Sequence, residues 1–155
     1  MYINFYNNEI LKDNEIFLSL IGTFEADVKR KWVPYYQFKI CLLDGTPVGN
    51  CNLKIDNTIL TKYCGNIGYN IFEQYRGNHY SLKASKLLLQ LARKHKLKYI
   101  LINCEPTNKA SNRICQLLNA KFIQKVNVPK AHAMYKEGKR EINIYKIELN
   151  YNEIT

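Results

Sequence analysis

The short stretch QYRGNHY, Gln74 to Tyr80, contains an arginine and a glycine immediately before a long amphipathic run. Amides at the start of a helix lack backbone acceptors and carry a partial positive charge, so such a turn can hold a phosphate group. Gly77 would let the backbone approach an anion closely, and Arg76 adds charge. The pattern is also typical of a plain connection between two elements. Neither the P-loop pattern nor the GxGxxG fingerprint occurs.

The spacing of apolar residues predicts the elements on either side of this turn. The segment NIGYNIF, residues 66–72, is predicted to be a strand, and a helix follows over about residues 78–95. The apolar stripe of this helix consists of Ala84, Leu87, Leu88 and Leu91. A strand, a glycine turn and a helix in this order fit an anion-binding turn.

A second strand and helix follow directly. The apolar run KYILINCEP, residues 98–106, has the length of a strand and predicts burial on both faces. Asn108 is predicted to cap a second helix, which should end at Asn119, a residue type that accepts the left-handed conformation. The strand–helix–strand unit is expected to cross over right-handed and to pair in parallel.

Strand patterns flank this central unit. Alternating apolar residues predict strands at residues 15–20, 35–43, 50–55, 122–128 and 141–149. An Asp-Gly turn joins the second and third of these as a hairpin, and residues 56–62 form a looser segment. In the last strand the apolar phase slips between Ile144 and Tyr145, as a bulge would cause. The chain is therefore expected to form a mixed α+β fold in one domain, residues 1–155.

The composition narrows the classes of partner. A formal net charge of +10 favours a polyanionic ligand, yet the lysines are scattered, which disfavours a dedicated nucleic-acid surface. No apolar run approaches the roughly 20 residues of a membrane span, and the first residues lack a signal-peptide pattern. The five cysteines form no CxxC pair, so reduced thiols in a cytoplasmic protein are expected. The cysteines and histidines do not share metal-ligand spacing.

The order of these elements resembles the GNAT superfamily of N-acetyltransferases. Those enzymes carry Gln/Arg-x-x-Gly-x-Gly/Ala at the turn that holds the pyrophosphate of acetyl-coenzyme A. The chain has Gln74, Gly77 and His79 at these positions, so a histidine stands where the family has glycine or alanine. The His79 ring would either reshape the phosphate site and contact it, or be an ordinary exposed side chain.

The second helix carries the other matching motif. In the superfamily it commonly opens with Asn-x-x-Ala/Ser and closes with Leu-Gly-x-Phe. Asn108, Ser111 and LNAKF at residues 118–122 match, with Asn119 in place of glycine. The likeness is clearest from about residue 48 to 128. It implies a central mixed, mostly antiparallel twisted sheet of six to seven strands, with a parallel splayed pair at the cofactor site and flanking helices.

The resemblance implies acetyl-coenzyme A as co-substrate, and no metal. The strand before the turn would pair its backbone with the pantetheine arm, the amides of the turn would hold the pyrophosphate, and the start of the second helix would contact the pantetheine or the adenosine end. In this order, the residues are Tyr69, Asn70 and Ile71; Arg76, Gly77, Asn78, His79, Tyr80 and Ser81; and Asn108 and Ser111.

The implied reaction is direct attack of an amine on the thioester, with a strand amide near Ile71 as donor to the oxyanion. In many relatives a tyrosine seven residues after the helix asparagine protonates the leaving thiolate. Cys115 holds this position and is either that acid or a buried structural cysteine. Tyr135 is either a substitute acid or a loop tyrosine. Glu105 is a candidate base. The alternatives are a water chain, or an amine that loses its proton on binding and needs no base.

The acceptor amine belongs to a small molecule or a protein. Trp32, Tyr35 and Tyr36 would line its pocket or form a packed connection, and residues 129–141 would form a lid. One alternative is an acyl-coenzyme A-binding sensor of the same fold without catalysis, and a less favoured one is a basic nucleic-acid-binding module. Because many relatives pair through their C-terminal strands, a homodimer is also expected.

Overall fold

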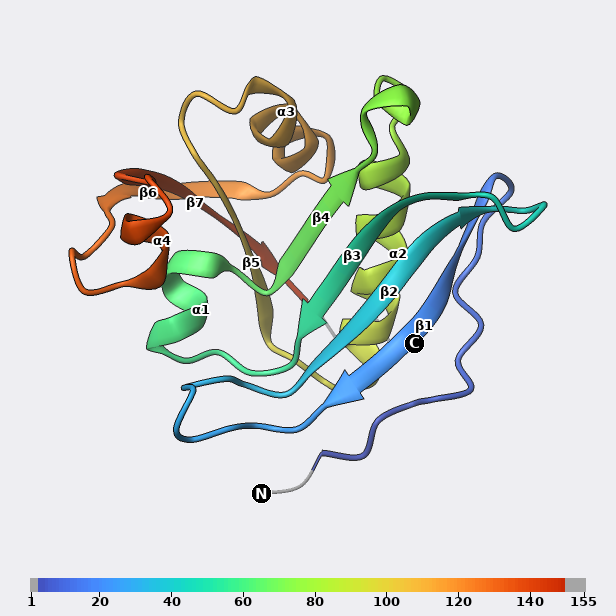
Figure 1. Ribbon diagram of the computed structural model, residues 1–155, viewed down its shortest axis with the longest axis horizontal. Coiled ribbons are helices and arrows are strands. Elements are labelled where there is room, and N and C mark those ends of the chain that lie inside the picture. The colour runs from blue at the N-terminus through green and yellow to red at the C-terminus, as the bar shows by residue number, and fades with distance from the viewer. Residues whose placement is uncertain (1–2, 150–155) are drawn as a thin grey trace, which may run out of the picture.

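The computed structural model describes residues 3–149, which form two antiparallel sheets and flanking helices (Figure 1). The first sheet has the order β1-β2-β3-β4 and the second β5-β7-β6. The strands are β1 (Ile16–Phe24), β2 (Tyr35–Leu42), β3 (Pro47–Lys54), β4 (Ile67–Ile71), β5 (Tyr99–Cys104), β6 (Lys121–Asn127) and β7 (Glu141–Glu148). The helices are α1 (Ile59–Cys64), α2 (Tyr80–Lys94), α3 (Lys109–Leu117) and α4 (Ala133–Lys136). The expected mixed α+β plan is confirmed.

The two sheets meet at β4 and β5, which run in the same direction and diverge (Figure 1). At their closed end the amide of Asn66 donates to the carbonyl of Leu101 (2.7 Å), and the amide of Leu101 donates to the side chain of Asn66 (2.8 Å). Beyond this point no ladder joins the two strands in the described residues, since β4 pairs with β3 and β5 with β7. The expected splayed parallel pair is therefore present.

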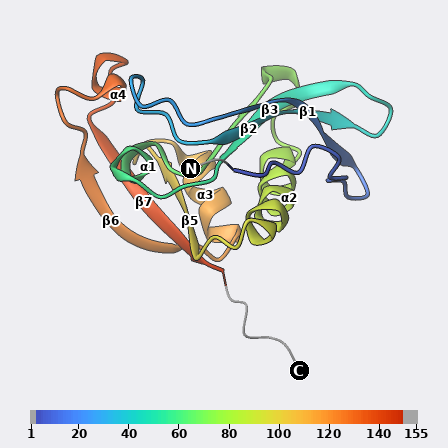
Figure 2. The same cartoon turned by 90° about the horizontal axis from the view of Figure 1, so that it is seen from below.

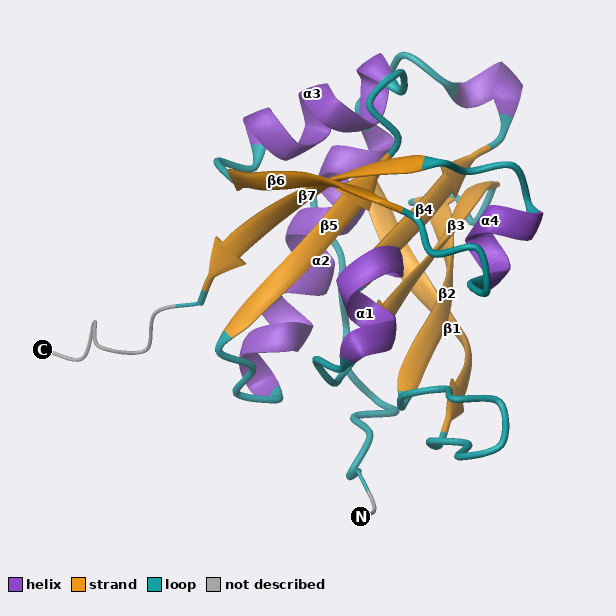
Figure 3. Ribbon diagram, turned by 90° about the vertical axis from the view of Figure 1, so that its left-hand side faces the viewer, coloured by secondary structure: helices purple, strands orange, loops and turns teal. Residues whose placement is uncertain are grey.

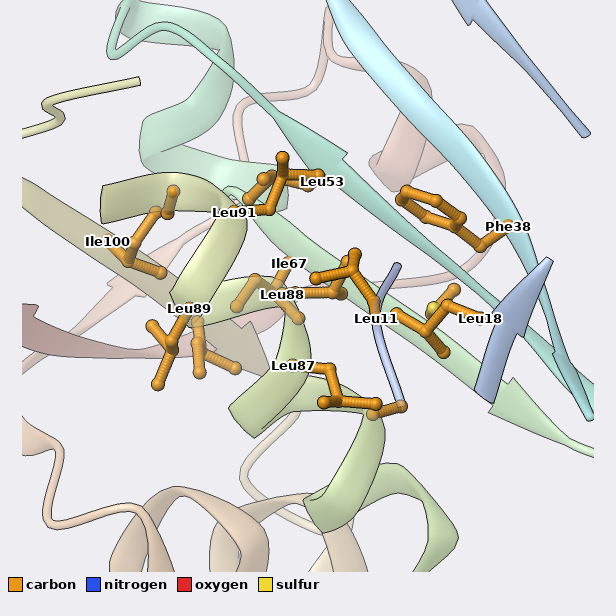
Figure 4. Packing of buried hydrophobic residues seen from close by; sticks show 14 of the residues in the cluster. Leu11, Leu18, Phe38, Leu53, Ile67, Leu87, Leu88, Leu89, Leu91 and Ile100 are labelled. Atoms are coloured by element: carbon orange, nitrogen blue, oxygen red, sulfur yellow. The ribbon is translucent and has the colours of Figure 1, made fainter. Parts of the chain in front are cut away.

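Helix α2 supplies much of the core. From below, α2 and the second sheet lie on the same side of the first sheet (Figure 2). Leu87, Leu88 and Leu91 are buried as predicted, and they point from α2 toward the strands (Figure 4). Leu89 is buried too, so the apolar face is wider than the predicted stripe. Each such burial contributes roughly 1.5–3 kcal/mol to folding.

Strand β5 differs from its prediction. Ile100, Ile102 and Cys104 are buried, but the residues between them are partly exposed, so burial on both faces was wrong. The reason is that the second face of β5 meets a small apolar cluster through Leu101 and the short helix α1 through Asn103, whose side chain donates to the Lys62 carbonyl (2.6 Å). Beyond that cluster, Asn103 lines an open cavity.

The predicted change of apolar phase in the last strand, β7, is present, but the inserted residue lies in the neighbouring strand, β6. Phe122 pairs with Tyr145 and Gln124 with Ile144, so Ile123 of β6 is the extra residue. Ile144 consequently packs in the small cluster and Tyr145 in the main core.

Two short helices were not predicted. Helix α1 lies in the segment taken as loose and sits beside β5 (Figure 3). A pair of hydrogen bonds between Thr58 and Thr61 starts it: the Thr58 amide donates to Thr61 Oγ1 (2.8 Å), which donates back to the Thr58 carbonyl (2.9 Å). Helix α4 begins where the His132 ring accepts from the Met134 amide (3.1 Å). Helices of one or two turns show too few residues for a periodic signal.

None of the helices described is long and apolar enough to cross a membrane. Within residues 3–149, no group of three or more histidine, cysteine or acidic side chains is arranged to hold a metal ion. All five cysteines are free, and only Cys64 is not fully buried.

Candidate functional site

The turn between β4 and α2 combines two residues of left-handed backbone with an open surface. Gly77 has φ +91° and His79 has φ +60°. A Cβ atom at Gly77 would meet nothing within 4 Å. The turn is held in place by Arg76 Nε, which donates to the Ile71 carbonyl (2.9 Å), and by Asn78 Nδ2, which donates to the Tyr75 carbonyl (3.0 Å).

The start of α2 offers unpaired donors to this surface. His79 is the N-cap residue and its side chain makes no capping hydrogen bond. The first amides of a helix have no intrahelical acceptor, so those of Tyr80 and Ser81 face outward with a partial positive charge. The turn and the helix start can therefore bind an anion mainly through the backbone.

Replacing His79 with glycine is expected to raise the free energy of unfolding by about 0.5–1 kcal/mol, because glycine adopts φ +60° without a Cβ clash. Lys31, an exposed loop residue with φ +58°, is a matched control, and Lys31→Gly should give a similar gain. Thermal denaturation measures both. A loss of stability confined to His79→Gly would contradict the expectation and would indicate that the ring makes stabilising contacts.

One cavity of about 330 Å³ brings the predicted cofactor residues together. Its wall comes from three places in the chain: the end of β4, the turn into α2, and the start of α3. The predicted residues in this wall are Tyr69, Asn70, Ile71, Arg76, Gly77, Asn78, His79, Tyr80, Ser81, Asn108 and Ser111. No predicted cofactor residue lies outside it; their roles in binding stay predictions.

The phase of the β3–β4 ladder decides which backbone groups of β4 are available. The amide of Phe72 donates to the carbonyl of Val48 (2.9 Å), so residues in phase with Phe72 turn their backbone groups toward β3. Asn70 is in this phase. Tyr69 and Ile71 are out of phase, and their backbone groups face the opening between β4 and β5.

The start of α3 is fixed across the opening. The Asn108 side chain accepts from the amide of Ser111 (3.1 Å), which confirms the predicted N-cap. The hydroxyl of Tyr69 donates to Ser111 Oγ (3.0 Å). Burial raises the pKa of Tyr69 to about 12, with a smaller effect of the Cys115 and Cys104 thiols. Tyr69 is therefore a neutral hydroxyl at the point where β4 and α3 meet.

Asn112 was not singled out from the sequence, yet it holds the link from β5 to α3. Its Nδ2 donates to the carbonyls of Asn108 (2.7 Å) and Glu105 (3.1 Å). Its Oδ1 accepts from the hydroxyl of Tyr145 (2.7 Å) and from Asn143 Nδ2 (3.0 Å). Only the tertiary structure reveals this role, because the partners on β7 lie more than 30 residues away.

A second cavity, of about 580 Å³, opens between the splayed strands and shares Tyr69, Asn108 and Ser111 with the first. Glu105 lines it, as the sequence predicted for a residue at the cleft. Lys54 also lines it and was missed, because in the sequence it is an ordinary polar position of an alternating strand.

The other two candidate catalytic residues lie away from these cavities. Cys115 is completely buried beside Cys104, and a hydrogen bond with Cys104 together with burial raises the pKa of its thiol. This location favours the structural alternative. Tyr135 packs against the small apolar cluster, and the guanidinium of Arg140 lies 3.8 Å from its ring centroid. Neither residue lines the cavities described here.

The aromatic residues near Trp32 were predicted either to line an acceptor pocket or to form a packed connection, and the structure shows both. Trp32 and Tyr35 line a cavity of about 280 Å³, whereas Tyr36 is buried in the core. A larger, mainly apolar cavity of about 640 Å³ adjoins it at Trp32 and is also lined by His132, from the segment expected to form a lid.

Residues 11–121 match the family model described as an acetyltransferase (GNAT) domain. Sequence comparison with curated proteins finds no significant match.

Solved structures of low identity share the fold. RimL, a ribosomal L7/L12 alpha-N-protein acetyltransferase in complex with coenzyme A, aligns with a TM-score of 0.65 at 14% identity, over 91% of this chain and 98% of that one. The acetyl transferase from Salmonella typhimurium that modifies the N-terminal serine of L7/L12 aligns with a TM-score of 0.57 at 18% identity, over 79% of this chain and 67% of that one. A GNAT-family acetyltransferase from Bacillus anthracis aligns with a TM-score of 0.57 at 18% identity. The alignment covers 72% of this chain and only 65% of the length of that protein.

Proposed function

We propose that this chain, which belongs to the acetyltransferase (GNAT) domain family, is an N-acetyltransferase that transfers the acetyl group of acetyl-coenzyme A directly to an amine. The observation that carries the proposal is the cavity in which the β4 edge, the glycine turn and the start of α3 meet. Coenzyme A in the related RimL structure supports the choice of co-substrate.

Binding uses three kinds of group on this chain. The amides between Gly77 and Ser81, with the positive end of α2, would hold the pyrophosphate. The outward backbone groups of Tyr69 and the outward amide of Ile71 would pair with the pantetheine amides, as an added strand would, while the Ile71 carbonyl accepts from Arg76 Nε. The cavity of about 580 Å³ would receive the acceptor amine next to the thioester.

The acetyl transfer needs a donor for the oxyanion, a base and an acid. An outward amide of β4 would polarise the thioester carbonyl. Glu105, which lines the acceptor cavity, or a water chain would remove the amine proton. The amine nitrogen then bonds to the acetyl carbon as the carbon–sulfur bond breaks, and the thiolate takes up a proton.

We propose Tyr69 as the donor of that proton. Its hydroxyl meets α3 at Ser111, on the helix that also carries Cys115, so it can substitute for the tyrosine that relatives carry on that helix.

Tyr69→Phe is expected to lower kcat by about tenfold with the KM for acetyl-coenzyme A little changed, because a thiolate leaves readily even without an acid. Steady-state kinetics measures both constants. Tyr80→Phe removes a hydroxyl from the wall of the first cavity and is the control. An unchanged kcat in Tyr69→Phe would exclude this role.

The proposed function is tested by acetyl-coenzyme A binding followed by transfer. At 100 times its Kd, a ligand that binds only the native state stabilises it by about 2.7 kcal/mol, which is visible in a melting curve. An unchanged melting temperature at millimolar acetyl-coenzyme A would refute the proposal.

The second candidate, a sensor without catalysis, is favoured by the burial of Cys115. It predicts the same stabilisation without acetylation of any amine in a broad panel.

A further inference from the structure

Lys54, the last residue of β3, lies on a wall that two cavities share. One is the cavity of about 580 Å³ between the splayed strands, and the other is the aromatic cavity of about 280 Å³ at Trp32 and Tyr35. Asn52 lines both cavities as well, because residues i and i+2 of a strand share a face. Lys54 therefore stands between the place of acetyl transfer and an aromatic pocket.

The ammonium group of Lys54 has a weak set of partners. Its Nζ donates to Asn52 Oδ1 (3.1 Å), a neutral oxygen. Within residues 3–149 no carboxylate forms an ion pair with it. Burial lowers the pKa of Lys54, and the neighbouring Cys64 thiol opposes this effect to a smaller extent.

The acidic side chains of the same cavity do not neutralise Lys54. Glu137 lies 3.9 Å from the ammonium group of Lys139, with which it forms an ion pair. Glu105 lines the cavity without an ion pair among the described residues. Apart from the Glu137–Lys139 pair, the cavity thus presents one carboxylate, Glu105, and one ammonium group, Lys54, which a ligand of both charges would match.

We infer that Lys54 binds a carboxylate of the acceptor, and that the acceptor is an amino acid with an apolar or aromatic side chain. The inference rests on the proposed function. The amine would lie in the cavity with Glu105, the carboxylate at Lys54, and the side chain against Trp32 and Tyr35. A polycationic acceptor is disfavoured, because Lys54 and a net charge of +10 would repel it.

The test compares two acceptors that differ in one group. L-phenylalanine and phenethylamine share the ring and the amine, and only phenylalanine has the carboxylate. With the unchanged protein, kcat/KM for phenylalanine should exceed that for phenethylamine by about tenfold or more, as a charge-assisted contact allows. In Lys54→Met the ratio should fall to about one, and in Lys54→Arg it should stay above one.

Lys139→Met is the matched control, since Lys139 lines the same cavity but already has Glu137 as a partner. It should leave the ratio unchanged. Melting curves with acetyl-coenzyme A are recorded for every variant. An unchanged protein that acetyl-coenzyme A fails to stabilise refutes the proposed function itself. Three outcomes with normal stabilisation by acetyl-coenzyme A overturn only the inference about the acceptor. They are no acetylation of phenylalanine, a preference for phenethylamine, and a ratio in Lys54→Met as high as that of the unchanged protein.

Discussion

Replacing Gly77 with tryptophan is expected to weaken acetyl-coenzyme A binding by more than about 100-fold and to abolish turnover. The indole would fill the open space of the turn, where a Cβ now meets nothing within 4 Å, and would keep the phosphates from the backbone amides. Losing two charge-assisted hydrogen bonds of about 1.5–3 kcal/mol each is enough for this effect. A titration followed by calorimetry, with melting curves in parallel, measures the loss.

Gly45 provides the control for backbone strain. It has φ +94°, close to the +91° of Gly77, and also has nothing within 4 Å of a built Cβ. It lies in the turn between β2 and β3, away from the cavities. Gly45→Trp should therefore cost a similar amount of stability, about 1–2 kcal/mol, and leave acetyl-coenzyme A binding intact. Equal affinities in the two variants would show that the Gly77 turn does not hold the phosphates.

Replacing Asn66 with leucine is expected to lower the free energy of unfolding by about 3–5 kcal/mol. Asn66 is completely buried at the closed end of the β4–β5 opening. Its Nδ2 donates to the carbonyls of Lys54 and Asp56 (both 3.1 Å), and its Oδ1 accepts from the amide of Leu101 (2.8 Å). Leucine leaves these three backbone groups without their partner, at about 1–3 kcal/mol each before the structure relaxes.

Denaturant unfolding measures this effect, with Asn127→Leu as the control. Asn127 is exposed at the end of β6, so its replacement should change stability by no more than about 0.5 kcal/mol. A cost below about 1 kcal/mol in Asn66→Leu would mean that these hydrogen bonds do not hold the two strands together.

The family could be predicted from the sequence because its signals are local. The strand, the Gly77 turn, the apolar stripe of α2 and the Asn108 cap each depend on residues a few positions apart. Backbone conformation and helix periodicity are decided at that range, so these features follow from residue type and spacing. The matching family model confirms the resemblance that they indicated.

The candidate chemistry could be predicted only in part. The sequence pointed to Cys115 and Tyr135 through a family position and a polar loop, but it carries no signal for burial beside Cys104 or for the stacking of Arg140. Nor does it distinguish Lys54 from other lysines on strand faces. Whether a polar group lies in the core, in a cavity or in water depends on segments that are distant in the chain.

The amino-acid sequence by itself determined the strands, the two long helices, their order and the glycine turn, and hence the family, since all of these follow from short-range backbone preferences. Only the tertiary structure decided which groups can act together. It joined Tyr69 to Ser111 across 42 positions, fixed the splayed strands through Asn66, and put Lys54 between two cavities. The physical reason is that cavities and hydrogen-bond partners arise where distant segments meet, and no local pattern specifies that meeting.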